Sequence, residues 1–315
     1  MGFFFQNYSF INIVGFILLV LGLVFINEIT RRSRKWSYFF YIAVPIFLVI
    51  AIALKWVSSP SSETWFGVVK TFSALAGVLG FMAIRYSKNV AASKFAIVFP
   101  VAILAINICE AIYRDLEVYM TYKVQVVDEA GVVMLGGVWN VMNALAGVFL
   151  LLTLTGWVGI KVAKTKSEDM VWADQLWFWI IAYDAWNIAY CYNCISTRAM
   201  YAGVSLILSC TIAEFCIKKG IWLQHRAQTL ALFGMFSLAF DYNSVSAFNI
   251  TATYNPAAWT VLSAIALIIN LAVFIYEVYV IVKYKRNPLK EEMYTHLRAY
   301  EENLKVNNLS DLQKA

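Results

Sequence analysis

The chain has 315 residues, of which 61% are hydrophobic and only 14% are charged, and its formal net charge is +6. An average soluble domain is about 45–50% apolar and about 25% charged, so this chain has too few charges to cover the surface of a water-soluble globule. Disorder needs low hydrophobicity and high net charge, and only the last stretch of the chain fits that description. The composition therefore predicts an all-α, polytopic helical membrane bundle.

The N-terminal apolar run is predicted to stay in the protein as a membrane span. Residues 1–7 contain no basic residue, unlike the start of a cleavable signal peptide. The run Phe10–Ile26 is followed by Arg31, Arg32, Arg34 and Lys35 instead of a small-residue cleavage site.

A helix needs about 20 apolar residues, at 1.5 Å each, to cross the hydrocarbon layer. By this criterion the sequence predicts nine spans. In chain order they cover residues 9–28, 38–57, 65–85, 93–113, 134–162, 172–195, 199–217, 224–242 and 257–283. We expect residues 1–286 to form a single transmembrane domain.

Basic residues mark alternate connections between these spans. The connections of one set hold Arg31, Arg32, Arg34, Lys35, Arg85, Lys88, Lys94, Lys161, Lys164, Lys166, Lys218, Lys219, Arg226, Lys283, Lys285 and Arg286, and those of the other set are slightly acidic. The positive-inside rule then predicts an outside N-terminus and a cytoplasmic C-terminus. Because orientation accounts for the net charge, we expect lipid and a small-molecule ligand as partners, and no nucleic acid.

The tail, residues 287–315, is predicted to be a cytoplasmic amphipathic helix. Pro288 suits the first turn of a helix, and Glu291 and Glu292 suit its positive end. The apolar residues recur at helical spacing: Leu289, Met293, Leu297, Tyr300 and Leu304. Such a helix lies on the membrane surface or on the protein's own inner loops. The alternative is that it binds a partner or a second copy, making a homo-oligomer.

Polar groups inside spans are costly and are therefore candidates for function. At 1.5 Å per residue, one set falls in the outer half of the bilayer and is expected to meet in one outward-facing chamber. This set is Lys70, Asn107, Glu110, Asn140, Asn143, Asp184 and Asn187. A second set near the inner ends, Glu28, Asp174, Glu214 and Glu277, is expected to pair with basic loop residues.

The predicted sixth span places aromatic rings beside an acid. Trp179, Tyr183 and Trp186 share one helical face, and Asp184 and Asn187 lie on the adjoining face. An acid beside aromatic rings is typical of sites for amines and other cations, which ring faces attract. The competing interpretation is that the rings pack against other helices and that Asp184 forms an ion pair with Lys70.

Cys191 and Cys194 form a C-x-x-C pair at the outer end of the same span. In an oxidising compartment this motif suits a membrane thiol oxidoreductase, although apolar packing of the thiols is the simpler interpretation.

His225 and His296 are not spaced as metal ligands, and the usual enzyme motifs are missing. We therefore expect no metal, no cofactor and no enzymatic activity. The group Gln224-His225-Arg226 is interpreted as an inner-side anchor, with an anionic headgroup or effector as the alternative.

The stretches Tyr183-Asp184-Ala185-Trp186-Asn187 and Lys218–Gln228 are similar to an uncharacterised bacterial family of multi-pass membrane proteins. The resemblance implies a bacterial inner-membrane protein and supplies no catalytic residues.

Three functions remain open: a secondary transporter or permease for a small polar molecule such as an amine, a receptor that signals through its tail, and a thiol oxidoreductase. In the first, Asp184 is the counter-ion, and Lys70 and Glu110 gate or pair.

Overall fold

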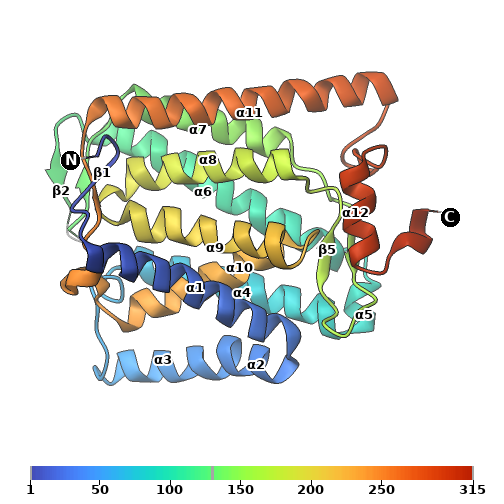
Figure 1. The fold of residues 1–315 in the computed structure, drawn as a ribbon, viewed down its shortest axis with the longest axis horizontal. Helices are drawn as coiled ribbons and strands as arrows, with labels where there is room; N and C mark the ends of the chain where they lie inside the picture. Colours follow the sequence, from blue (N-terminus) through green and yellow to red (C-terminus); the bar gives the residue numbers. More distant parts are fainter. Residues whose placement is uncertain (1, 129–130, 314–315) are drawn as a thin grey trace.

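The computed structural model describes residues 2–128 and 131–313, which form a bundle of roughly parallel helices with the termini at opposite ends (Figure 1). The helices are α1 (Phe10–Arg32), α2 (Arg34–Tyr38), α3 (Val44–Ala53), α4 (Trp65–Tyr86), α5 (Lys88–Ala91), α6 (Phe99–Thr121), α7 (Val138–Leu152), α8 (Trp177–Cys194), α9 (Leu206–Ile212), α10 (Trp222–Ala239), α11 (Pro256–Tyr284) and α12 (Arg298–Val306). A π-helical segment, Phe39–Ala43, joins α2 to α3, and two more, Ala199–Ser205 and Ala213–Ile217, flank α9. The predicted all-α class is confirmed.

Local sequence explains where several helices begin. The side chains of Ser9 and Thr64 accept hydrogen bonds from the backbone N–H groups of Asn12 and Gly67, and so cap α1 and α4. Asn255 caps α11 in the same way, and Pro256 occupies the first helical position, where its missing N–H costs nothing.

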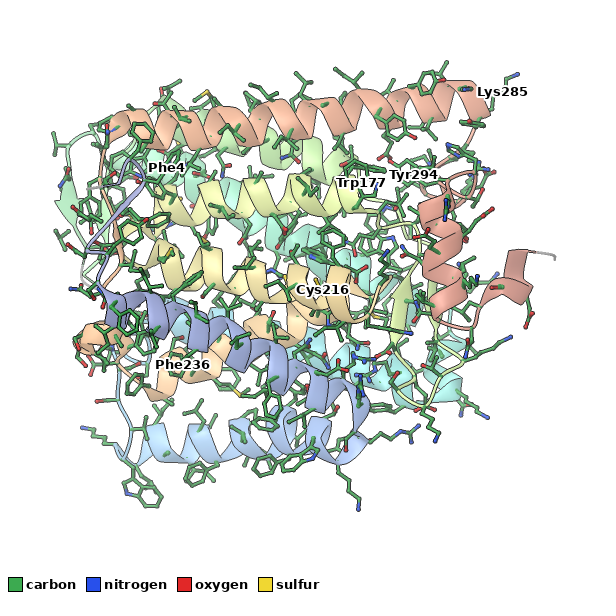
Figure 2. All side chains as sticks on the ribbon, in the orientation of Figure 1. Phe4, Trp177, Cys216, Phe236, Lys285 and Tyr294 are labelled. Carbon is green, nitrogen blue, oxygen red and sulfur yellow. The ribbon has the colours of Figure 1, made fainter. Side chains whose placement is uncertain are left out.

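Within the described residues, six helical segments are long and apolar enough to cross a membrane. They are Phe10–Arg32, Arg34–Ala53, Gly67–Tyr86, Ala96–Thr121, Ser196–Ile217 and Pro256–Tyr284. Their outward sides carry exposed apolar residues such as Phe25, Phe47 and Ile268, at 62–67% exposure. In Figure 2 the side chains that project from α3 and α11 are mostly carbon. This surface belongs in lipid, so the chain is a membrane protein.

The other three predicted spans correspond to α7, α8 and α10, which have 15, 18 and 18 residues. Most residues of α8 and α10 are buried between the other helices. Because protein and not lipid surrounds these two helices, they carry rings and polar groups where a lipid-facing helix carries aliphatic ones. For these three, membrane crossing stays a prediction.

One predicted span is wrong in extent. The apolar stretch 134–162 contains the end of strand β3 (Val133–Met134), helix α7 and strand β4 (Ile160–Val162). Gly156 turns the chain after α7 with a φ of +78°, and an added Cβ there would lie 2.2 Å from Trp172 Nε1. Strand β4 then pairs antiparallel with β5 (Met170–Trp172), with Ile160 opposite Trp172.

Two more short antiparallel pairs close the opposite end of the bundle. Strand β2 (Val126–Val127) pairs with β3, and β1 (Phe5–Gln6) pairs with β6 (Thr251–Ala252). The β1–β6 pair joins the N-terminus to the segment that leads into α11. The Gln6 side chain reinforces it by donating to the Ala252 carbonyl at 2.9 Å.

The tail is not one long helix, because α12 spans only nine residues and starts at Arg298. Residues Met293, Tyr294, Tyr300 and Leu304 are at most 3% exposed and form a small core with the β4–β5 hairpin and the start of α8. Of the two locations predicted for the tail, the structure therefore shows the one on the protein's own loops. Tyr294 lies near Trp177 at this end of the bundle (Figure 2).

Candidate functional site

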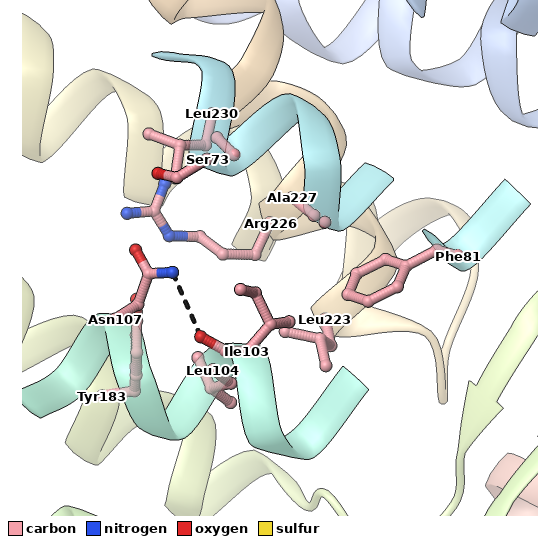
Figure 3. A pocket seen from close by; sticks show the side chains of 12 residues that line it. Ser73, Phe81, Ile103, Leu104, Asn107, Tyr183, Leu223, Arg226, Ala227 and Leu230 are labelled. Carbon is pink, nitrogen blue, oxygen red and sulfur yellow. Dashed lines mark hydrogen bonds between the residues drawn. The ribbon is translucent and has the colours of Figure 1, made fainter. Parts of the chain in front are cut away.

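A cavity of about 40 Å³ lies between α4, α6, α8 and α10 (Figure 3). Its polar lining consists of Ser73, Asn107, Tyr183 and Arg226, one from each helix, and apolar side chains such as Leu223 complete the wall. None of the described residues that line it is an aspartate or a glutamate.

Arg226 is the charged group of this cavity. It is 6% exposed, and its Nε and Nη1 atoms have no hydrogen-bond partner. Its guanidinium carbon lies 5.9 Å from the centroid of the Tyr183 ring, a weakly favourable cation–π geometry. In Figure 3 the guanidinium extends from α10 between Ser73 and Asn107.

The interpretation of Gln224-His225-Arg226 as an interface anchor is wrong, because all three side chains are buried. Gln224 donates to Asp169 at 3.0 Å, and the His225 ring contacts the Asn27 amide at 2.7 Å. Arg226 lies four residues into α10, about 6 Å from the helix start. The cavity is therefore nearer the β4–β5 end of the bundle than the predicted outer-half chamber.

Lys70, Asn107 and Glu110 lie together on α4 and α6. The Lys70 ammonium donates to Asn107 Oδ1 at 2.8 Å and forms an ion pair with Glu110 at 2.9 Å. Both charged side chains are partly exposed. Asn107 therefore links this ion pair to the cavity that it lines.

Asp184 is not paired with Lys70, so the ion-pair part of the competing interpretation is wrong. Its Oδ2 accepts a hydrogen bond from the Thr211 hydroxyl at 2.7 Å, and its buried Oδ1 has no partner. Asp184 follows Tyr183 on α8 but does not line the cavity.

The aromatic stripe packs as a ladder along α8. The ring centroids of Trp179 and Tyr183 are 5.7 Å apart, and those of Tyr183 and Trp186 are 5.4 Å apart. Trp222 of α10 meets Tyr183 edge-on at 4.7 Å. Of the three predicted wall residues, Tyr183 alone lines the cavity, while Trp179 and Trp186 hold α8 in place.

Asn140 and Asn143 surround a carboxylate that the sequence analysis missed. Their amides donate to Asp115 of α6 at 3.0 and 2.7 Å, and Asn193 and Cys194 approach the same carboxylate at 3.5 and 3.4 Å. Asp115 is fully buried. It lies four residues after Ala111 on the buried face of α6, a periodicity that was visible in the sequence.

The two cysteines of the C-x-x-C pair are buried free thiols. Cys194 points to Asp115, whereas Cys191 lies 3.9 Å from Asn187 Oδ1 and 3.8 Å from the Ala202 carbonyl. Asn187 thus contacts Cys191, whereas Asn140 and Asn143 bind Asp115. In the part of the chain that the structure describes, no three His, Cys, Asp or Glu residues lie close enough to hold a metal. Thiol chemistry stays a prediction.

A buried ionic network lies where the β4–β5 hairpin meets α1 and α4. Arg31 contacts Asp169 at 2.7 Å and Glu28 at 2.7 Å, and Arg85 lies 3.7 Å from Asp169. Burial alone would raise the pKa of Asp169, but the charges of Arg31 and Arg85 outweigh it and hold that pKa below its usual value. The predicted pairing of Glu28 with basic residues is confirmed.

Contrary to prediction, the other three acids of that set form no ion pair with a Lys or Arg among the residues that the structure describes. Glu214 accepts the backbone N–H groups of Gly220 and Ile221, and Glu277 accepts the Tyr294 hydroxyl. Asp174 accepts the N–H groups of Met293 and Tyr294 at 2.9 and 2.7 Å. Burial raises the pKa of Asp174 to about 6, although these N–H groups act in the opposite direction.

Comparison with known families covers nearly the whole chain. A model described as a family of unknown function, DUF5692, matches residues 6–306. The chain belongs to this family. No curated protein and no solved structure matches the chain, so the match brings no assigned activity and no site residues.

Proposed function

We propose that this protein is a secondary transporter or permease, without enzymatic activity, that binds a small polar solute in the cavity between α4, α6, α8 and α10. The observation that carries the proposal is Arg226, a buried guanidinium with two unpartnered nitrogens that faces this cavity. A charge inside a membrane bundle is costly, and such groups typically mark solute or ion pathways.

Polar groups also lead from the cavity toward the start of α4. Asn107 lines the cavity and accepts a hydrogen bond from Lys70, which is paired with Glu110 near the surface. Separating Lys70 from Glu110 would open a polar route to the cavity. We therefore assign this ion pair as the gate.

The proposed setting is a bacterial inner membrane, with nine spans, the N-terminus outside and the C-terminus in the cytoplasm. In support, the termini lie at opposite ends of the bundle, and polar side chains gather at the end that carries α12 (Figures 1 and 2). Lys and Arg in short connections mark the cytoplasmic side. The cavity then lies closer to the cytoplasm, and the gate lies on its outer side.

Osmotic swelling of proteoliposomes tests the proposal even though the solute is unidentified. Liposomes with and without protein are exposed to equal gradients of an ethylammonium salt, a small sugar alcohol and a sodium carboxylate, and swelling is followed by light scattering. We expect at least one solute to enter at least tenfold faster with protein. Equal rates for every solute would contradict a permease.

A cavity-filling variant ties permeation to the site. A Cβ on Gly77 would have only Ile103 Cγ1 within 4 Å, at 3.9 Å, so the Gly77→Leu side chain has room to grow into the cavity. We expect it to stop entry. The matched control is Gly22→Leu, on an open face of α1.

If the solute is an amine with Asp184 as its counter-ion, Asp184→Asn stops entry of the ethylammonium salt.

A membrane sensor that signals through its tail is the second candidate. The observation that favours it is the docking of the tail onto two bundle elements, because Asp174 binds the backbone of Met293 and Tyr294, and Glu277 of α11 binds the Tyr294 hydroxyl. Truncation after Arg286 separates the candidates. At a temperature at which the truncated protein remains folded, a permease keeps its swelling activity, whereas a sensor loses its output in cells.

A further inference from the structure

The cavity around Arg226 has one formal charge and no counter-charge in its wall. Its described lining contains Arg226, three neutral polar side chains and otherwise apolar groups. In the described chain, no ion pair includes Arg226. An ammonium ligand in this space would meet a like charge at short range, where the low dielectric makes repulsion strong.

The neutral polar groups do not offset this charge. The Asn107 amide donates to the Ile103 carbonyl at 3.1 Å, and its oxygen accepts from Lys70. The Ser73 hydroxyl donates to the Lys70 carbonyl at 3.0 Å, so its proton is used within α4. Arg226 therefore supplies the charged donors of the cavity, through its unpartnered Nε and Nη1 atoms.

The size of the cavity limits the ligand. A water molecule occupies about 30 Å³ of liquid, and a site needs at least about 10–15 Å³ of probe-occupied volume to hold one. About 40 Å³ thus accommodates an ion of a few heavy atoms and is too small to enclose a nucleotide, a sugar or a phospholipid headgroup.

We infer that Arg226 binds a small monovalent anion in this cavity: chloride, nitrate or a carboxylate of one or two carbons. Charge-assisted hydrogen bonds from Nε and Nη1 hold the anion, and the apolar wall strengthens them by excluding water. The inference rests on the proposed function for its role as a transported solute. Binding itself does not depend on transport, so the two are measured separately.

Thermal unfolding of the purified protein in detergent tests binding. Sodium chloride, nitrate, formate and gluconate are compared at equal ionic strength, and gluconate is the anion too large for the cavity. We expect the melting temperature to rise in a saturable way with at least one small anion relative to gluconate. Arg226→Gln should remove this difference or weaken the affinity at least tenfold. The exposed Arg32→Gln variant should retain the response.

A second variant keeps the test decisive if Arg226→Gln does not fold. Gly77→Leu fills the cavity and leaves the guanidinium in place, so it should also abolish the anion response. An identical response in wild type and in either variant that folds would overturn the inference, as would identical melting of the wild-type protein in all four salts.

Anion flux into proteoliposomes separates this inference from the proposed function. Saturable binding that depends on Arg226, without flux, would establish the anion site and refute the permease. Swelling with an amine or a neutral solute, together with no anion binding, would overturn the anion site and leave the permease standing.

Discussion

Asp169 offers the strongest test of the energetics at the β4–β5 end of the bundle. It is fully buried and accepts hydrogen bonds from Arg31 at 2.7 Å, Ser167 at 2.5 Å and Gln224 at 3.0 Å. Asp169→Asn keeps the volume but leaves Arg31 and Arg85 without this shared negative charge. Breaking a buried ion pair costs about 3–5 kcal/mol.

The partners that remain place the expected loss at the lower end of that range. Arg31 keeps Glu28, and Arg85 keeps backbone carbonyls of the hairpin at 2.8 and 3.1 Å. We therefore expect Asp169→Asn to lower the free energy of unfolding by about 3 kcal/mol. Equilibrium unfolding in mixed micelles with increasing SDS, followed by tryptophan fluorescence, measures this value.

The neighbouring acid provides a matched control. Glu168 is 37% exposed and pairs with Arg34, which is 51% exposed. Exposed pairs contribute about 0–1 kcal/mol, so Glu168→Gln should have little effect. Losses below about 1 kcal/mol in both variants would refute the argument that burial makes the Asp169 charge indispensable.

Three further predictions concern the tail, its pH dependence and one helix contact. Because burial raises the pKa of Asp174 from 3.8 to about 6, the folded state holds a proton between these pH values that the unfolded state has released. Stability should therefore fall by about 2 kcal/mol as the pH rises from 4 to 7. Melting curves should show this decline, and Asp174→Asn should flatten it. Truncation after Arg286 should lower the melting temperature, since each buried tail side chain contributes about 1.5–3 kcal/mol, whereas truncation after Leu309 should not. Gly15→Ala places a Cβ 2.3 Å from a backbone carbonyl oxygen and should cost about 1–3 kcal/mol in the same unfolding assay, while Gly22→Ala meets nothing within 4 Å and should gain up to about 1 kcal/mol.

Hydrophobic runs predicted the lipid-facing helices well, because those helices must be apolar on their outer sides. They predicted less about α8 and α10, since a helix surrounded by protein can carry Trp222, Arg226 and Asp184 without meeting lipid. The run that contains β4 was assigned to a helix because Ile160 and Val162 pack against the same apolar core as the helices, so the sequence reads as one continuous apolar stretch.

Sequence placed several polar residues at similar depth but did not say which ones meet. Depth along a helix is fixed by 1.5 Å per residue, whereas the direction of each side chain depends on how the helices rotate and pack. Lys70 thus contacts Glu110 and not Asp184, and Asn140 and Asn143 turn toward Asp115. Arg226 appeared in the sequence only as part of a basic group assigned to the membrane interface, with anion binding as the alternative, because sequence did not show that its side chain is buried.

The β1–β6 pair and the Asp174–Tyr294 contact have a consequence for biosynthesis. Gln6 lacks Ala252, and Asp174 lacks Tyr294, until these partners emerge from the ribosome 246 and 120 residues later. These two contacts therefore form only after the last helices have been made, later than the contacts of Arg31 and Arg85 with the β4–β5 hairpin. A nascent chain stalled before α11 would expose both ends to proteases and chaperones, so quality control can distinguish unfinished copies from complete ones.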